Sequence, residues 1–220
     1  MAEQQSGVRD TAQGNRFERR RALTRSALIG AARAILAEQG APGDASIQQI
    51  AERADVGFGS FYNHFETKAA LFDAAVSNAL EEYGQLLDKV AGTLDDPAEV
   101  FAASVRMTIR MVETHPELAQ ILRGSGLAQL HAETGLAPRA LRDIETGIAR
   151  GRFQVEDPLI ALSAIGGSLL GLLQLETLRP EVVGPAAGEQ LAALVLRMLG
   201  LPPEEAREVA RRPLPPLPPA

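Results

Sequence analysis

The sequence predicts an all-α fold: an N-terminal three-helix domain followed by a larger helical domain. Apolar residues recur three and four positions apart along most of the chain, which is the spacing of a buried helix face. Helix-start signals precede several of these stripes. Ser46 is an N-cap with Gln49 three residues later, and the run Asp96-Pro97-Ala98-Glu99 combines an N-cap, a first-turn proline and a carboxylate. Two short helical patterns flank a tight turn within residues 46–65.

Composition narrows the classes of protein. The chain has 220 residues, enough for one large or two small domains, and no cysteine, so it has neither disulfides nor a thiolate metal site. Its first twenty residues are polar and lack the apolar core of a signal peptide, which favours the cytoplasm. Residues 1–16 are low in hydrophobicity, and we expect them to be disordered.

Charge is divided unevenly along the chain. The segment 16–25 holds five arginines against Glu18, a local charge of +4 in a chain of net charge −6. Such a basic segment on an acidic body suggests an end that faces DNA. Arg19 or Arg20 would then reach a phosphate or the minor groove, and the alternative is an ordinary solvated helix start.

Residues 17–66 read as a helix-turn-helix domain. A stripe over 22–39 ends at Gly40, and the first short helix follows the Ser46 cap. Residues 55–57 form a turn, and the pattern restarts at Phe58. The second short helix carries small, aromatic and hydrogen-bonding residues in place of the acids that would repel phosphate. This geometry is that of one helix bracing another in a major groove.

The run AERADVGFGSFYNHFETKAALF resembles the DNA-binding signature of the TetR family of bacterial transcriptional repressors. The resemblance extends over nearly the whole chain and implies a recognition helix over 58–64. Gly57 stands where the family usually has a Ser or Thr cap. Phe58 stands where the family often has a basic or polar residue, and a thymine methyl would be a suitable partner for its ring. The DNA-binding residues predicted in this way are Arg19, Arg20, Ser46, Gln48, Gly57, Phe58, Gly59, Ser60, Tyr62, Asn63, His64 and Lys68.

Residues 67–212 are predicted to form a helical domain for effector binding and dimerisation. Thr67 caps a helix to about residue 90, whose ~1.5 Å rise per residue spans about 36 Å and connects the two domains. Helices then follow over 97–114, from 116 to about 123, and over 138–151, with a loop or broken helix over 125–137. A Pro-rich tail occupies 213–220, either as an inert end or as a ligand for an aromatic groove.

Residues 158–175 carry no charge, which invites a membrane interpretation. We reject it because the run contains glycine, serine and glutamine, lacks close basic flanks and has no second span. A helix that is apolar on most sides is expected to be buried in protein. The small residues of this helix recur every four positions, so one side of it allows close approach of another backbone. Dimerisation through the last two long helices, which the family resemblance also implies, would pair it with a symmetry mate. The predicted dimer interface comprises Ser163, Gly167, Leu170, Gly171, Leu191, Leu194, Val195 and Met198.

The resemblance further implies a small-molecule effector inside the second domain, between the long connecting helix and the helices near 97–114 and 138–175. Methionines and aromatic residues there are also typical of plain core. An apolar lining would favour a hydrophobic effector. The predicted ligand-binding residues are Tyr83, Phe101, Met107, Arg110, Met111, His115 and Phe153.

The sequence lacks nucleophile-elbow, dinucleotide and P-loop spacings, and its three histidines show no metal-ligand spacing, so we expect neither an enzyme nor a cofactor. The function predicted is that of a homodimeric repressor of a palindromic double-stranded DNA operator, with recognition helices ~34 Å apart, released when the effector shifts the population of conformations. A transcriptional activator of the same fold remains an alternative. So does a helical ligand-binding or scaffold protein without sequence-specific DNA binding.

Overall fold

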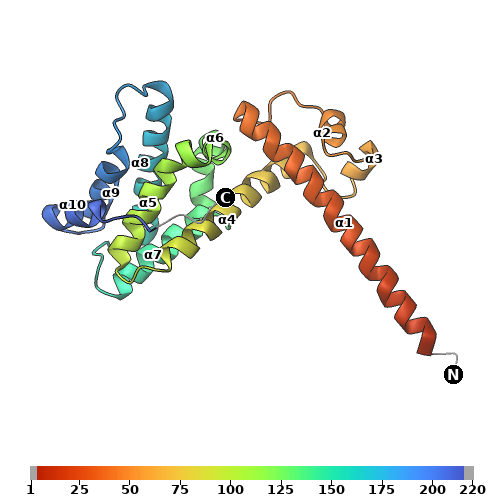
Figure 1. Ribbon diagram of the computed structural model, residues 1–220, viewed down its shortest axis with the longest axis horizontal. Helices are drawn as coiled ribbons and strands as arrows, with labels where there is room; N and C mark the ends of the chain where they lie inside the picture. The colour runs from red at the N-terminus through yellow and green to blue at the C-terminus, as the bar shows by residue number, and fades with distance from the viewer. Residues whose placement is uncertain (1–3, 216–220) are drawn as a thin grey trace. The chain divides into compact units, whose positions relative to one another are not determined.

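A computed structural model describes the backbone of residues 4–215 and the side chains of residues 17–215, and every regular element in that part of the chain is a helix (Figure 1). The chain forms two compact units, Met1–Ala75 and Val76–Ala220. The boundary falls inside α4 (Lys68–Ala91), whereas the sequence placed it at 66/67. Leu71, Phe72 and Ala75 are buried, so the first turns of α4 belong to the first unit.

The first unit begins with α1 (Gln4–Gln39), which is longer than predicted. Disorder was expected for 1–16, but the backbone of 4–16 continues the helix; residues 1–3 lie outside the described part. Adding residues to an existing helix avoids the unfavourable nucleation step, so a helix can continue beyond the apolar pattern that predicted it. At the other end Gly40 adopts a φ of 72° and stops the helix, as predicted.

Two short helices follow α1 in this unit. The predicted capping box opens α2 (Ile47–Arg53): the Ser46 hydroxyl accepts a hydrogen bond from the Gln49 amide, and the Gln49 side chain accepts one from the Ser46 amide. Then α3 (Phe58–Phe61) follows a turn in which Asp55 has a φ of 52°. It is shorter than the predicted 58–64, because residues 62–64 continue as turns with bonds such as His64 N–H to Phe61 C=O.

The second unit is built around α5 (Pro97–Thr114), which contacts α7 (Leu136–Ala149), α8 (Pro158–Leu178) and α9 (Ala187–Met198). It also contacts α6 (Pro116–Ser125) and α10 (Pro203–Arg211). The predicted cap is present, since the Asp96 carboxylate accepts a hydrogen bond from the Ala98 amide at 3.0 Å. The central position of α5 explains why so many of its residues are buried.

The predicted loop or broken helix over 125–137 is the 3₁₀ helix η1 (Gly126–His131) and the turn after it. Gly126 and Gly135 have φ values of 62° and 87°, a region that glycine enters without strain, and they bracket this segment. The segment packs on α6, α7 and α8. Of the Pro-rich tail, residues 216–220 lie outside the described part of the chain.

Candidate functional site

The surface of α3 is aromatic. The side chains of Phe58 and Tyr62 are 52% and 56% exposed, and their rings meet edge to face with centroids 6.1 Å apart. Phe61 lies fully buried beneath them and Tyr62 packs against its ring at 5.3 Å. The buried ring therefore anchors a short helix that presents two rings to solvent, where base edges and sugars can be contacted.

Two further predicted DNA-binding residues, His64 and Lys68, follow α3 in the chain. His64 is partly buried, and burial together with the positive charges of Arg21 and Arg25 lowers its pKa. The Lys68 ammonium donates hydrogen bonds to the carbonyls of Ala45 and Gly43, at 3.1 and 3.4 Å. Lys68 is thus held against the loop that precedes α2, which places its charge beside the N-terminus of that helix.

The remaining predicted DNA-binding residues differ in what they offer. The Ser46 hydroxyl is engaged in the capping box, and the Gln48 amide donates to Glu52 at 3.0 Å. Gly57 caps α3 without a side-chain hydrogen bond, and a Cβ at Gly59 would meet nothing within 4 Å. Of the other predicted residues, Arg19 and Arg20 on α1 and Asn63 after α3 are exposed, and Ser60 on α3 is half-buried.

A cavity of about 110 Å³ lies inside the second unit, between α4, α5, α7 and α8, with η1 and α6 completing its wall. Most of the lining is apolar and includes Phe101, Val105, Leu162 and Ile165. An apolar cavity of about 150 Å³ is known to hold a benzene ring, so this space suits one small ring better than a long acyl chain.

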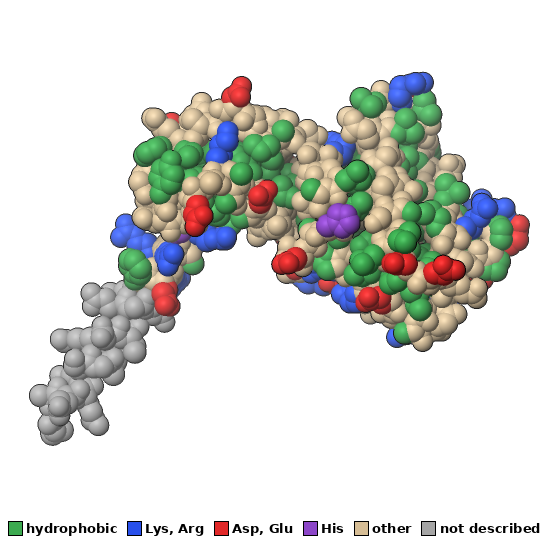
Figure 2. All heavy atoms as spheres, turned by 180° about the vertical axis from the view of Figure 1, so that it is seen from behind, with side chains coloured by type: hydrophobic (Ala, Val, Ile, Leu, Met, Phe, Trp, Pro, Cys, Tyr) green, Lys and Arg blue, Asp and Glu red, His purple; other side chains and the backbone are tan. Residues whose placement is uncertain are grey.

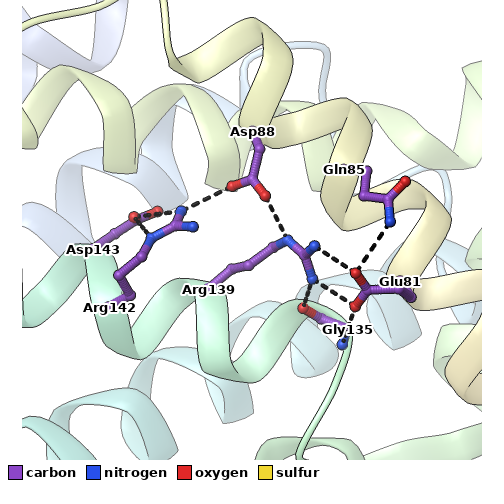
Figure 3. Close-up of polar contacts among 7 residues, drawn as sticks. All are labelled: Glu81, Gln85, Asp88, Gly135, Arg139, Arg142 and Asp143. Atoms are coloured by element: carbon purple, nitrogen blue, oxygen red, sulfur yellow. Dashed lines mark hydrogen bonds and ion pairs between the residues drawn. The ribbon is translucent and has the colours of Figure 1, made fainter.

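A charged network forms one wall of the cavity (Figure 3). The Arg139 guanidinium on α7 donates two parallel hydrogen bonds to Glu81 of α4, at 2.7 and 2.8 Å, and a third to Asp88 at 2.8 Å. Arg142 bridges Asp88 and Asp143, each at 2.8 Å. Asp88, Arg139 and Asp143 line the cavity itself. The network therefore joins α4 to α7 and also meets whatever fills the space.

The Arg139 side chain passes close over Gly84. A Cβ at Gly84 would lie 2.8 Å from three atoms of Arg139, so Arg139 would have to shift if a larger residue stood there. At the start of α7, the Gly135 amide donates to Glu81 at 3.0 Å, and the Gly135 carbonyl accepts from Arg139 at 2.7 Å. Glu81 and Arg139 thus tie α4 to the first turn of α7 by backbone and side chain together.

The carboxyl groups of this network have different proton affinities. Hydrogen bonds from Arg139 and the Gly135 amide lower the pKa of Glu81 to about 2. Burial acts to raise the pKa of Asp88, but hydrogen bonds from Arg142 and Arg139 outweigh it and leave that pKa lowered. Burial raises the pKa of Asp143, against the opposing effect of Arg142. Burial thus disfavours the charged form of Asp143, and a new hydrogen-bond donor in the cavity would favour it.

The predicted ligand-binding residues only partly coincide with this cavity. Phe101 lines it. Tyr83 is buried and donates to the Met107 carbonyl at 2.9 Å, so it is part of the core. His115 follows α5 and its ring packs against Tyr83, with centroids 5.6 Å apart, whereas Arg110 is exposed at a separate polar groove. The others, Met107, Met111 and Phe153, are buried and do not line the cavity.

Sequence reasoning missed the polar wall. The signal for Asp88 was present, because Glu81 and Asp88 are seven residues apart and so share one face of α4. No comparable signal existed for Arg139 and Asp143, since charges spaced along α7 look like a solvated face. What turns them toward the cavity is the packing of α7 against α5 and α8.

An apolar face on α8 and α9 remains uncovered in the protomer. Ile160, Leu178 and Leu194 are 69%, 66% and 54% exposed (Figure 2 shows one side of the molecule with its exposed hydrophobic side chains). A Cβ at Gly167 or Gly171 would meet nothing within 4 Å, so this side of α8 is open, as the spacing of its small residues predicted. The predicted interface residues Ser163, Leu170 and Met198 are exposed or half-buried.

Two of the predicted interface residues are already buried within the protomer, whereas most of α8 is not. Leu191 and Val195 are 7% and 0% exposed because this flank of α9 packs on α5 and α10. Among the described residues, α8 is the helix that is both long enough and apolar enough to cross a membrane. Only 17% of its most apolar window is buried within the protomer. A partner that covers α8 is therefore needed to bury it.

These features define a class. A capped helix, a tight turn and a short exposed helix form a helix-turn-helix DNA-binding unit, and a helical body with an internal cavity follows it. The model of bacterial regulatory proteins of the tetR family matches residues 28–75, and the model of the tetracyclin repressor-like C-terminal domain matches residues 96–212. The chain belongs to the TetR family of transcriptional regulators, with an N-terminal DNA-binding domain and a C-terminal ligand-binding domain.

Solved structures agree. RolR in complex with resorcinol is 37% identical, covers 90% of this chain and 98% of its own, and has a TM-score of 0.74. RolR without ligand is also 37% identical, covers 88% of this chain and 99% of its own, and has a TM-score of 0.75. SmeT, the repressor of a multidrug efflux pump of Stenotrophomonas maltophilia, shares the fold at 21% identity and a TM-score of 0.59, covering 79% of this chain and 88% of its own. A comparison with curated proteins finds no match.

Proposed function

We propose that this protein is a homodimeric, cytoplasmic repressor that binds a palindromic operator and is released by a small, neutral, hydroxylated aromatic compound. The observation that carries the choice of effector is the cavity: a ring-sized apolar space with Asp88, Arg139 and Asp143 at one wall. An apolar body with two hydroxyl donors suits such a wall, because the ring fills the lining and each hydroxyl can donate to a carboxylate. The resorcinol bound by RolR is a compound of this class.

The charges of the network argue against an anionic effector. Glu81, Asp88 and Asp143 carry three negative charges against the two positive charges of Arg139 and Arg142, and all five groups already share hydrogen bonds. A carboxylate entering the cavity would lie beside Asp143, and like charges in a partly buried site repel. A neutral hydroxyl avoids this penalty.

Release of DNA is proposed to follow from the position of the network. α4 starts in the DNA-binding unit and carries Glu81 and Asp88 on its second half, so a ligand that redistributes the hydrogen bonds of Asp88 and Arg139 acts on this helix directly. The ligand lowers operator affinity by the difference between its affinities for the two arrangements of the dimer, and by no more.

The test has two parts. Selection of bound duplexes from random DNA should recover a palindrome, and a gel shift on that duplex should show release by resorcinol. Calorimetry should show resorcinol binding more tightly than 3-hydroxybenzoate. Asp143→Asn should weaken resorcinol binding by about tenfold, because a hydrogen bond to a charged group contributes about 1.5 kcal/mol or more.

Glu145→Gln is the matched control, since this acid is exposed on α7 and does not line the cavity. If both variants bind resorcinol as the wild type does, the assigned wall is wrong. If the wild type prefers no duplex over bulk competitor, the protein is a ligand-binding or scaffold protein instead. Reporter expression that rises with the regulator present would identify an activator of the same fold.

A further inference from the structure

We propose that the phosphate-binding surface of the DNA-binding unit extends from α3 onto α1 through Arg21 and Arg25. This inference goes beyond the signature residues, because neither arginine belongs to the helix-turn-helix motif. It rests on the DNA binding proposed above and adds two contact residues to it.

Arg25 is placed by an aromatic ring. Its guanidinium carbon lies 5.0 Å from the centroid of Phe65, whose ring is 5% exposed and contacts Phe61. A guanidinium over a ring face is attracted there by the ring quadrupole. The same buried rings that anchor α3 therefore also fix the position of a cation on α1.

Arg21 stands one turn earlier on the same face of α1, since residues four apart in a helix are neighbours. Both arginines lie close enough to His64 for their positive charges to lower its pKa, in addition to the effect of burial. His64, Arg21 and Arg25 thus form one patch beside α3. A phosphate at this patch would be met by two cations and by a neutral imidazole that can donate a hydrogen bond.

Among the residues whose side chains are described, neither Arg21 nor Arg25 forms an ion pair, whereas Arg53 on α2 is paired with Glu38. Figure 2 shows basic side chains gathered where the described side chains of α1 begin. Binding a phosphate stabilises an arginine that has no ion-pair partner, such as Arg21 or Arg25, more than one that is already ion-paired, such as Arg53.

These contacts should position the protein without reading sequence. The arginines lie on α1 and not on the short helix that carries Phe58 and Ser60, so we expect them to meet backbone phosphates instead of base edges. Phosphate contacts weaken or strengthen binding to every duplex alike, whereas base contacts change the preference between duplexes. This difference supplies the readout that separates the two roles.

The experiment measures binding as a function of salt for Arg21→Gln and Arg25→Gln. Each phosphate contact contributes about 0.9 to the slope of log K against log salt, so each variant should lower the slope by about 1.8 in a dimer. The operator found by selection and a bulk duplex should lose affinity by the same factor. Arg25→Lys keeps the charge and should keep the slope, which separates the contact from an effect on folding.

Arg53→Gln is the matched control, because it removes the same formal charge from the same unit at a site where Glu38 already neutralises it. The proposal is overturned if Arg21→Gln and Arg25→Gln keep the wild-type slope, or if Arg53→Gln lowers the slope equally, which would indicate net charge alone. A changed ratio of operator to bulk affinity would assign the arginines to base readout and also overturn it. Absence of any operator preference in the wild type would be a failure of the proposed function, which these variants do not affect.

Discussion

At the scale of single residues, the turn between α2 and α3 contains the one non-glycine residue with positive φ in the described part of the chain, Asp55. Left-handed backbone conformations are strained for most side chains, and Asp tolerates them better than most because its short polar side chain can bond locally. The turn sets the angle at which α3 leaves α2. Strain at this position therefore bears directly on the recognition surface.

Asp55→Ala should destabilise the DNA-binding unit by about 1 kcal/mol relative to Asp55→Gly, because alanine lacks both the local bonding of Asp and the freedom of glycine. Thermal unfolding followed by circular dichroism measures the difference between the two variants. Equal melting temperatures for the alanine and glycine variants would show that the turn relaxes to negative φ. Both variants remove the same exposed carboxylate, so charge does not distinguish them.

At the scale of elements, the contact between α4 and α7 combines structural and regulatory roles. Glu81 holds the Arg139 guanidinium by two hydrogen bonds and also accepts the Gly135 amide, yet Glu81 does not line the cavity. Arg139 and Asp88 do line it. The contact between α4 and α7 therefore has two parts. A ligand in the cavity can contact Arg139 and Asp88, but it cannot contact Glu81 directly.

This division predicts a separation of binding from response. Glu81→Gln should leave the affinity for resorcinol within about threefold of wild type, while reducing the factor by which resorcinol weakens operator binding. Titration calorimetry gives the first quantity, and fluorescence anisotropy of labelled operator with and without resorcinol gives the second. Gln85→Ala, on the same helix and at the edge of the network, serves as control and should retain the full response. A wild-type response in Glu81→Gln would show that the contact between Glu81 and Arg139 has no role in the mechanism.

At the scale of the whole molecule, α8 is the element that the protomer leaves incomplete. It is apolar on all sides, and only a few of its residues, such as Leu162, Ile165 and Leu173, are buried by their own chain. Exposed apolar patches of this kind mark interfaces. A second copy offering the same face would cover both helices by two-fold symmetry, with the open Gly167 and Gly171 side permitting close approach.

Leu194→Asp should convert the dimer to monomers, because two carboxylates would be buried in the symmetric interface without partners. Sedimentation velocity measures the mass, and operator affinity should fall with it because the two recognition helices are no longer linked. Leu127→Asp is the matched control: Leu127 is 63% exposed against 54% for Leu194, but it lies on η1. If Leu194→Asp stays dimeric, the interface lies elsewhere.

The sequence by itself determined the elements that depend on local chemistry. Caps at Ser46, Thr67 and Asp96 and the stop at Gly40 follow from hydrogen bonding and backbone conformation within a few residues, so they were readable from the chain. The family resemblance made Phe58 and Tyr62 candidate DNA contacts, and in the structure both are exposed whereas Phe61 between them is buried.

Only the tertiary structure decided how apolar and charged faces are used. Leu191 and Leu194 look alike in the sequence, yet one packs inside the protomer and the other faces outward, because the partner of each face is chosen by distant helices. Arg139 and Asp143 resemble a solvated stripe, but the packing of α7 beside α4 brings Arg139 onto the bare surface at Gly84 and turns both side chains to the cavity. Local patterns specify which side chains can be buried, and long-range packing specifies what they are buried against.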